Sequence, residues 1–465
     1  MASVLFWWPR YNPISKPRIS PTPPAMARPH ENLTANARRR FLRRLGGFFV
    51  APLFCSPGIR EALAEPVAME KLNIGVVGVG NHGASNLAAM KQQAVVAVCD
   101  VDAGYLQRTR QEFSSARHYR DWREMLQHPD LDAVVVSTPD HQHAGCAMGA
   151  IEKGLHVYCE KPLAHNIEET RLMKKMALQA GVITQLGNQH HSSRGYRLAV
   201  RWLQAGILGP VDRIVAWTNR PLWPQGISRP RGGGRTPAGL EWDLWLGPAA
   251  VRRYHPAYHP LAWRGWWDFG SGTLGDMGPH LLDPVVSGLA LSAPREVTSQ
   301  SSPANRWTFP ASSIVRMTFD QVHRQETPLE LSWYDGGEKP AVEIEGRLPA
   351  NGVMLYGERA RMFIPDYGRM PRLMGDPGGN SDDLPDLPGH RQQWIEACHL
   401  GRQTSCDFGY AARLTEICLL GNISIRSGQA VHWDRQRGRI TNEPSLNHLL
   451  GRQRRSGWEL PDVIR

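Results

Sequence analysis

Residues 78–83 (GVGNHG) fit the pattern G-x-G-x-x-G and lie between an expected strand and an expected helix. Glycines lack a Cβ, so the backbone can approach a pyrophosphate closely, and the N-terminus of the next helix offers N–H groups and a positive dipole end. This pattern predicts a dinucleotide site. The residues expected to contact the dinucleotide are Gly78, Gly80, Asn81, His82 and Gly83.

A carboxylate ends the next expected strand, 17 residues after Gly83. Asp100 is placed to accept hydrogen bonds from ribose hydroxyls and would repel a 2′-phosphate, so NAD is expected rather than NADP. The simpler alternative for the two features together is a tight glycine turn and an unpaired surface aspartate.

Two polar segments follow later strands. Residues 137–143 (STPDHQH) and 160–162 (EKP) each come directly after an apolar run. Ligands of open α/β sheets bind at the carboxyl ends of strands, so these segments should meet the cofactor there. Lys161 could also exchange a proton with a substrate hydroxyl. By itself a Glu-Lys-Pro loop is typical of a solvated turn. The residues expected at the cofactor are Ser137, Thr138, Pro139, His143, Glu160 and Lys161.

Residues 276–280 (DMGPH) place an acid and a histidine four positions apart. On a helix this spacing puts Asp276 and His280 on one face, about one turn apart. Together they could hold a substrate hydroxyl and accept its proton as hydride leaves the same carbon. The alternative is a structural aspartate cap with a surface histidine.

The elements that must position these residues alternate along the chain from Lys71 onward. Short β-branched runs are expected as strands, and Asn166 with Glu169 predicts a capped helix that stops at Gly181. Alternation with continuous apolar strands predicts a doubly wound parallel sheet, a Rossmann domain of residues 72–190. The expected strands are 72–77, 94–98, 133–136, 155–158 and 182–184, and the other helices 85–91, 102–113, 121–127 and 144–153.

Beyond residue 190 the pattern changes, and a Gly, Pro and Trp-rich stretch covers about 220–284. Strands without intervening helices predict an α+β domain over 191–440 with an antiparallel or mixed sheet. Residues 441–465, with Arg452, Arg454 and Arg455, are expected to be a solvated tail or an oligomer contact. The expected strands are 213–218, 313–319, 329–333, 341–345 and 361–364, and the helices 196–204, 391–399 and 410–427.

The N-terminal segment predicts an export signal. Residues 37–43 (ARRRFLR) fit the twin-arginine pattern, residues 45–59 are uncharged, and residues 62–64 (ALA) offer a cleavage site after Ala64. The prediction is a twin-arginine signal over residues 1–64 and a periplasmic or otherwise exported protein. The alternative is a basic disordered tail.

Charge and composition limit other functions. Residues 1–64 hold ten basic and two acidic residues, so most of the net charge of +11 lies in this segment, and nucleic-acid binding by the rest is not expected. No apolar run reaches eighteen residues, so we expect a soluble protein. Six cysteines follow the segment and are expected as buried free thiols, with a Cys398–Cys406 bridge as the alternative. The histidines lack metal-ligand spacing, so no metal is predicted.

Together, GVGNHG, Asp100, EKP at 160–162 and DMGPH at 276–280 resemble the Gfo/Idh/MocA oxidoreductase family. Residues 242–248 (WDLWLGP), 263–268 (WRGWWD) and 414–422 (LTEICLLGN) are similar to its exported, twin-arginine branch. The resemblance implies a Rossmann domain followed by a domain with a large open, mostly antiparallel sheet, which serves substrate binding and homo-oligomer formation. It implies Lys161, Asp276 and His280 as the catalytic group, with Trp263 and Arg264 approaching cofactor and substrate.

This resemblance implies hydride transfer between a sugar or polyol carbon and a tightly held NAD. Some family members instead cleave glycosidic bonds through transient ring oxidation, but they carry a Tyr-Pro-Thr-His-Gly type segment where this chain has residues 273–280 (TLGDMGPH). That difference favours ordinary redox chemistry. A non-catalytic sugar- or dinucleotide-binding protein is a further alternative.

Overall fold

The computed structural model describes residues 70–320, 328–344, 346–375 and 383–461. These residues belong to one compact unit, Pro66–Arg465. The twin-arginine segment predicted for residues 1–64 lies outside the described residues. None of the described helices is long and apolar enough to cross a membrane.

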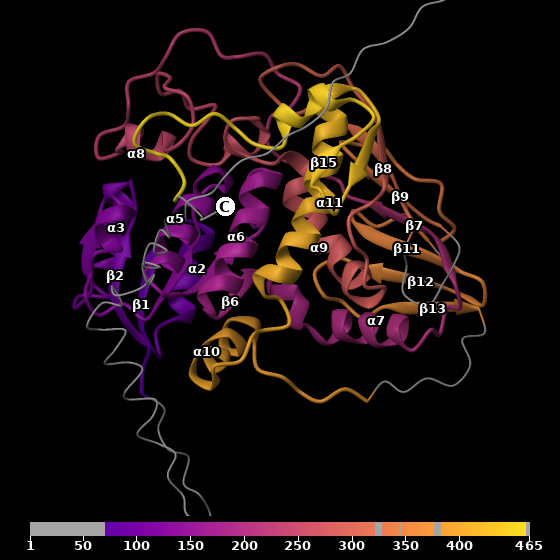
Figure 1. Cartoon of the computed structure of the whole chain (residues 1–465), viewed down its shortest axis with the longest axis horizontal. Coiled ribbons are helices and arrows are strands. Elements are labelled where there is room, and N and C mark those ends of the chain that lie inside the picture. Colours follow the sequence, from indigo (N-terminus) through magenta and orange to yellow (C-terminus); the bar gives the residue numbers. More distant parts are fainter. Residues whose placement is uncertain (1–69, 321–327, 345, 376–382, 462–465) are drawn as a thin grey trace, which may run out of the picture. The chain divides into compact units, whose positions relative to one another are not determined.

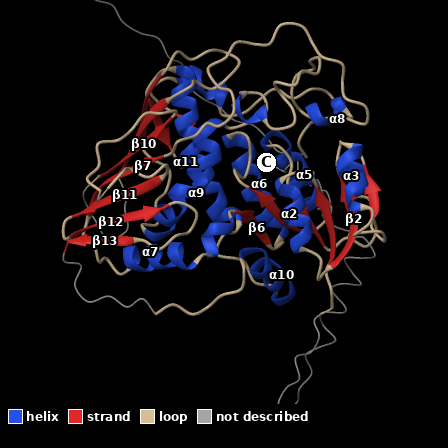
Figure 2. Ribbon diagram, turned by 180° about the vertical axis from the view of Figure 1, so that it is seen from behind, coloured by secondary structure: helices blue, strands red, loops and turns tan. Residues whose placement is uncertain are grey.

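Six parallel strands form the first sheet, in the order β3-β2-β1-β4-β5-β6. The chain runs from β1 outward to β3 and returns to β4 on the other side of β1, so the topological switch point lies between β1 and β4. Helices alternate with these strands (Figures 1 and 2), which confirms the predicted doubly wound sheet. The bounds are β1 Asn73–Val77, α2 His82–Ala89, β2 Ala94–Cys99, α3 Ala103–Thr109, β3 Arg117–Tyr119, α4 Trp122–Met125, β4 Ala133–Val136, α5 Asp140–Glu152, β5 His156–Glu160, α6 Ile167–Ala180 and β6 Thr184–Gly187.

The ends of α6 follow the signals in its sequence. The Asn166 side chain accepts a hydrogen bond from the Glu169 N–H at 2.9 Å, and Gly181 ends the helix in the left-handed region with φ 63°. Both ends agree with the prediction.

Nine strands form the second sheet, in the order β13-β12-β11-β7-β10-β9-β8-β14-β15. Strands β7 and β10 pair in parallel and the other neighbours run antiparallel, which confirms the open, mostly antiparallel sheet. The strand bounds are β7 Val211–Trp217, β8 Glu296–Ser301, β9 Ser313–Phe319, β10 Leu329–Asp335, β11 Gly352–Gly357, β12 Ala360–Pro365, β13 Arg372–Gly375, β14 Val431–Asp434 and β15 Arg439–Ile440. The helices are η1 Gln189–Ser192, α7 Arg194–Gln204, α8 Trp242–Leu246, η2 Ala262–Gly265, α9 Gly272–Gly288, α10 His390–Leu400, α11 Phe408–Ser427 and η3 Pro444–Leu449.

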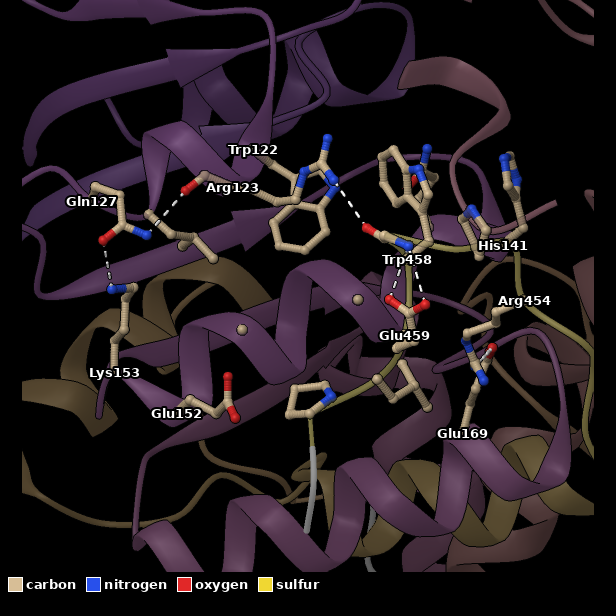
Figure 3. Close-up of a pocket in the computed structure, with 18 residues that line it drawn as sticks. Trp122, Arg123, Gln127, His141, Glu152, Lys153, Glu169, Arg454, Trp458 and Glu459 are labelled. Atoms are coloured by element: carbon tan, nitrogen blue, oxygen red, sulfur yellow. Dashed lines mark hydrogen bonds and ion pairs between the residues drawn. The ribbon is translucent and has the colours of Figure 1, made fainter. Parts of the chain in front are cut away.

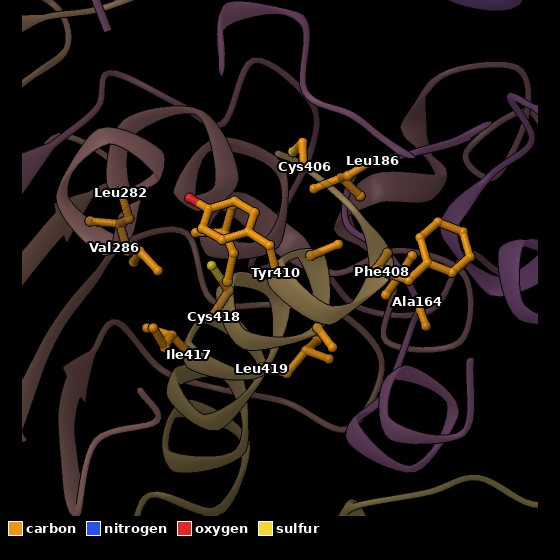
Figure 4. Packing of buried hydrophobic residues seen from close by; sticks show 14 of the residues in the cluster. Ala164, Leu186, Leu282, Val286, Cys406, Phe408, Tyr410, Ile417, Cys418 and Leu419 are labelled. Carbon is orange, nitrogen blue, oxygen red and sulfur yellow. The ribbon is translucent and has the colours of Figure 1, made fainter. Parts of the chain in front are cut away.

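Helix α11 connects the two sheets. It contacts α6 and β6 on one side, β8 and β9 on the other, and it packs along α9. Ile417 and Cys418 of α11 lie near Leu282 and Val286 of α9 (Figure 4), and all four side chains are buried. Most side chains of α11 are buried, the buried carboxylate of Glu416 is paired with Arg171, and the apolar residues of the helix join the two sheets in one hydrophobic core.

Helix α10 completes the core of the first sheet, although it comes after the strands of the second. Trp394 is fully buried and packs edge-on against Tyr158 of β5, with ring centroids 5.6 Å apart. The first sheet therefore takes core residues from far beyond the predicted boundary at residue 190.

Two predictions for the second half were wrong. Residues 341–344 form no strand, because Val342 and Ile344 lie over the apolar face of the sheet without pairing, and residue 345 lies outside the described residues. The expected solvated tail is also wrong for residues 452–458. Arg454 forms an ion pair with Glu169, and these side chains are only 12% and 1% exposed.

The six cysteines from Cys99 to Cys418 are buried and free, in agreement with the preferred interpretation. Cys55 lies outside the described residues.

Candidate active site

A cavity of about 410 Å³ opens at the carboxyl ends of β1, β2, β4 and β5. Its walls come from the first sheet, from the segment 259–264 and from α9. The structure therefore brings together residues from widely separated parts of the sequence, from Val77 to Trp458. The lining includes Gly78, Gly80, Asn81, His82, Gly83, Asp100, Ser137, Thr138, Pro139, Glu160, Lys161, Trp263, Arg264, Asp276 and His280.

The glycine segment turns tightly from β1 into α2. Gly78 has φ 80° and donates its N–H to Cys99 O at 2.8 Å, and a Cβ at Gly83 would lie only 2.0 Å from Gly78 O. Larger residues would therefore open the turn. Asn81 precedes α2 with φ 48°, and its side chain caps no N–H of the helix.

These features fit a dinucleotide. The start of α2 lines the cavity with its positive dipole end and no capping side chain, which is the arrangement that phosphates use. Thr138 also lines the cavity, and its buried Oγ1 has no hydrogen-bond partner. Gly78, Asn81 and Thr138 would therefore lie along the pyrophosphate.

Asp100 holds the glycine turn and faces the cavity. Its carboxylate accepts hydrogen bonds from the N–H groups of Val79 and Asp102, each at 2.9 Å. Burial raises the pKa of Asp100 to about 6, against the lowering effect of these hydrogen bonds. Asp100 is therefore largely ionised at neutral pH and able to accept hydrogen bonds from ribose hydroxyls.

Glu160 organises the opposite wall. Its Oε1 lies 3.2 Å from His82 Nε2 and accepts hydrogen bonds from Asn86 and Gln189, both at 2.8 Å. Burial alone would raise the pKa of Glu160, but the hydrogen bond and charge of His82 outweigh it and lower the pKa to about 2. The carboxylate thus ties α2 to the residues after β6.

His143 was expected to contact the cofactor, but the structure places its side chain away from the cavity. Its side chain is buried outside the cavity lining, with Nδ1 2.9 Å from Pro162 O and Nε2 2.8 Å from Thr138 O. His143 lies on α5 beneath the loops that follow β4 and β5. Its two hydrogen bonds fix the backbone of these loops, at Thr138 and next to Lys161.

Lys161 and Asp276 form an ion pair between β5 and α9. Lys161 Nζ lies 2.7 Å from Asp276 Oδ1 and also donates to Asp276 O at 2.8 Å, and the two side chains are 13% and 17% exposed. Arg264 Nε stands 3.5 Å from the same carboxylate oxygen. Burial would raise the pKa of Asp276, but the positive charges of Lys161 and Arg264 lower it to about 2.

The protonation of His280 follows from its neighbour Asn188. Asn188 Nδ2 donates to Pro279 O at 2.8 Å, which can only accept, so Oδ1 must face His280 Nδ1, also at 2.8 Å. Nδ1 therefore carries the hydrogen, and Nε2 keeps its lone pair. Burial and the positive charge of Lys161 lower the pKa of His280 to about 3, so the ring is neutral at physiological pH and Nε2 is free to accept a hydrogen bond.

The backbone of His280 is held as well. Residue 284 is a proline, so the carbonyl of His280 lacks the N–H it would meet one turn later, and the Tyr196 hydroxyl donates to it instead.

Sequence reasoning left three site residues without a role here. Asp140 lines the cavity from the first turn of α5, and burial raises the pKa of its carboxyl. His190 lines it too, with its ring 5.7 Å from that of His280 and 5.4 Å from that of Tyr367. Asn188 is fully buried. Asp140 lies in the polar segment 137–143 that follows β4. Asn188 and His190 follow β6, and their place at the carboxyl end of this strand was the one sequence signal for a position at the site.

The aromatic residues of the Trp-rich stretch divide into two groups. Trp266 and Trp267 lie in buried clusters and do not line the cavity, whereas Trp263 belongs to a buried cluster and also lines the cavity, with the Arg264 guanidinium 4.3 Å from its ring centre. Among the described residues, no group of three or more His, Cys, Asp or Glu is arranged to hold a metal ion.

Comparison with protein families agrees with this architecture. Residues 72–188 match the NAD-binding Rossmann fold of the Gfo/Idh/MocA oxidoreductase family, and residues 229–310 match the C-terminal alpha/beta domain of the same family. Both matches support assignment to this family.

Curated relatives include sugar and polyol dehydrogenases. The chain is 24% identical to levoglucosan dehydrogenase of Pseudarthrobacter phenanthrenivorans over 46% of this chain and 50% of the relative. It is 27% identical to myo-inositol 2-dehydrogenase of Thermotoga maritima over 39% and 54%. It is 30% identical to 2,7-anhydro-N-acetylneuraminate hydratase of Mediterraneibacter gnavus over 31% and 38%. The chain thus spans about half the length, or less, of these relatives.

Solved structures share the fold. The WlbA dehydrogenase of Bordetella pertussis, in complex with NADH and UDP-GlcNAcA, matches with a TM-score of 0.58 at 18% identity, over 79% of this chain and 99% of that one. The aldose-aldose oxidoreductase of Caulobacter crescentus matches with a TM-score of 0.54 at 15% identity, over 78% and 100%.

The geometry predicts that Asn188→Leu lowers kcat, because the His280 ring loses the acceptor that fixes its tautomer. We expect a fall of about 10- to 100-fold, typical of losing a supporting hydrogen bond behind an active-site histidine. The measurement is kcat with NAD saturating, together with the dissociation constant of NADH and the melting temperature. Since Asn188 does not line the cavity, NADH affinity should stay within about twofold, well under that range.

A Gln189→Leu variant is the control, since Gln189 bonds Glu160 and Tyr158 and not His280. Equal losses of kcat in both variants would show that Asn188 has no specific role toward His280.

Proposed function

We propose that this protein is an NAD-dependent oxidoreductase of the Gfo/Idh/MocA family that oxidises or reduces one carbon of a sugar or polyol. The observation that carries the proposal is the meeting of Lys161, Asp276 and a neutral His280 at one end of a cavity whose other end fits a dinucleotide. Relatives named for levoglucosan and inositol support a substrate with several hydroxyls.

The chemistry needs a hydride acceptor, which a bound NAD⁺ supplies, and a proton acceptor, which the chain supplies. His280 has the free lone pair on Nε2 and accepts the hydroxyl proton. Lys161 keeps an N–H beyond the two it gives to Asp276, and it donates this N–H to the substrate oxygen.

Lys161 therefore acts through its charge. As the C–H bond breaks, negative charge grows on the substrate oxygen, and an ammonium held in place by Asp276 stabilises that charge more than it stabilises the neutral hydroxyl. Asp276 stands one helical turn before His280 on α9, so its ion pair also brings Lys161 to the wall that holds His280. Arg264, between Asp276 and Trp263, limits the other side of the substrate space.

Glycoside cleavage through transient oxidation would use the same residues, and one relative is named a hydratase rather than a dehydrogenase. The two activities differ in net redox change. A dehydrogenase forms one NADH for each sugar consumed, whereas the transient mechanism releases a cleaved product with no net NADH. Product analysis beside absorbance at 340 nm distinguishes them, and binding of NAD without turnover of any sugar would favour the non-catalytic alternative.

Lys161→Met tests the catalytic assignment, because it keeps most of the side-chain length and removes the charge. The expected result is a loss in kcat of roughly 10² to 10³, the scale of removing one preorganised donor from a developing oxyanion. NADH titration should show that cofactor binding largely remains. A loss below about threefold, far under that scale, would show that the charge of Lys161 does not stabilise the transition state, and catalysis would rest on His280 and Asp276 alone.

Asp100→Asn tests cofactor choice. Asparagine keeps one oxygen for the N–H groups of Val79 or Asp102 but lacks the charge that repels a 2′-phosphate. The ratio of the NADP to the NAD dissociation constant should fall at least about tenfold, which corresponds to ~1.4 kcal/mol. Asp102→Asn, which changes the cap of α3 outside the cavity, should leave this ratio unchanged.

We also propose that residues 1–64 direct the folded protein through the twin-arginine export machinery to the periplasm. This proposal rests on the pattern ARRRFLR and the ALA site before Glu65.

Changing Arg38 and Arg39 together to lysine should leave unprocessed protein in the cytoplasm, because the receptor reads paired guanidinium groups. Cell fractionation and the N-terminal mass of the product measure this. Arg28→Lys, outside the pattern, is the control and should be exported and cut after Ala64. Normal export of the double variant would contradict the signal.

A further inference from the structure

The C-terminal segment 452–461, here called the strap, runs from the end of η3 to the side of the first sheet (Figure 1). It is fastened by charged side chains. Arg454 pairs with Glu169 of α6, Arg455 pairs with Asp243 of α8, and Arg123 Nη1 donates to Gly457 O at 3.1 Å. Since Glu169 is 1% exposed, the Arg454 pair is protected from solvent.

These attachments place Trp458 beside α4. Its ring lies edge-on to Trp122, with centroids 6.3 Å apart, and the Arg123 guanidinium stands 4.2 Å from its centre. Arg123 is itself held by Asp121 through bonds of 3.0 and 2.6 Å. Trp458 therefore has a fixed position rather than that of a free chain end.

Trp458 forms a wall between two cavities. It lines the 410 Å³ cavity of the proposed active site and a second cavity of about 340 Å³ beneath the strap (Figure 3). Trp122 and Gln142 line both cavities as well. The other strap residues at the second cavity, Arg454, Gly457, Glu459, Leu460 and Pro461, do not line the first.

The position of Trp458 along the first cavity follows from the strands. Lys161 and His280 mark the reacting end, at β5 and α9. Asp100 ends β2, and Trp122 begins α4 directly after β3, the neighbour of β2. The acidic residue after the second strand of a Rossmann sheet marks the adenosine ribose. Trp122 and Trp458 therefore lie toward the adenosine end.

We propose that Trp458 is a cofactor-binding residue, carried by the strap to the adenosine end of the cleft, where its indole contacts the purine base. The inference rests on the proposed function, because it assumes that the cavity holds NAD. Contact between a base and an aromatic ring changes affinity by about 5- to 150-fold on removal of the ring. The strap then retains the cofactor, as an exported enzyme with little free NAD around it requires.

Binding measurements on the mature protein test the proposal, with NADH and ADP-ribose as probes. ADP-ribose keeps the adenosine end and lacks nicotinamide. Trp458→Ala should weaken both probes by about tenfold or more, within the range for a lost base contact. Trp458→Leu keeps apolar bulk in the strap and should show the same loss if the alanine variant folds poorly.

Leu460→Ala is the matched control, since it shortens a side chain of the same strap that lines only the second cavity. Affinities within about twofold of wild type for Trp458→Leu, below the range for a base contact, would overturn the proposal. So would an equal loss in Leu460→Ala, which would mean that the strap acts only by stabilising the fold. A wild-type protein that binds neither probe would instead refute the proposed function itself.

Discussion

The ion pair of Lys161 and Asp276 is the contact on which the arrangement of the site depends. It joins the loop after β5 to α9, and both charges are largely withdrawn from water. Removing one partner of such a pair leaves an uncompensated charge at a cost of about 3–5 kcal/mol, so each residue holds the other in place. The ammonium bonds both the side chain and the backbone oxygen of Asp276, which fixes the rotation of α9 as well as its distance from β5.

That rotation brings His280 to the cavity wall, and the rest of α9 is adapted to keep it there. The two internal prolines remove N–H groups from the helix, and Tyr196 supplies a donor at one vacated position. Asn188 contacts the helix twice, at Pro279 O and at the His280 ring. On the far side, α11 packs along α9 and joins both sheets, so the position of α9 is set by the common core.

Sequence patterns predicted five of the six strands of the first sheet, because these strands carry local signals, but they missed the short edge strand β3, Arg117–Tyr119, which has no apolar run. The glycine turn, the β-branched strands and the cap at Asn166 all depend on neighbours within a few positions. Helix α9 shows the opposite case. Its Gly and Pro content is typical of a loop, and it is helical because long-range packing and Tyr196 compensate for the prolines. The spacing of Asp276 and His280 indicated a helix where the surrounding composition did not.

The sequence predicted the site residues that lie at the carboxyl ends of strands. It did not predict those that reach the site through contacts with segments distant in sequence. Lys161 and Asp100 follow strands, so fold rules place them. His143 carried the same signal, but its side chain turns into the core, and only the structure shows this. Asn188 follows β6, but its contacts with α9, like those of Trp458 with Trp122, join segments distant in sequence, for which one sequence offers no pattern.

The dependence of the cleft on distant segments links cofactor binding to folding. Its walls come from the first sheet, from the segment with Trp263, from α9 and from the strap, which follows η3 in the sequence. A ligand that binds only the assembled cleft stabilises all four segments together, by RT ln(1 + [L]/Kd). The cleft is complete only when Trp458 is in place, which requires a folded chain, and NAD is abundant only inside the cell. The proposed export of an already folded chain would therefore favour loading of NAD before transport.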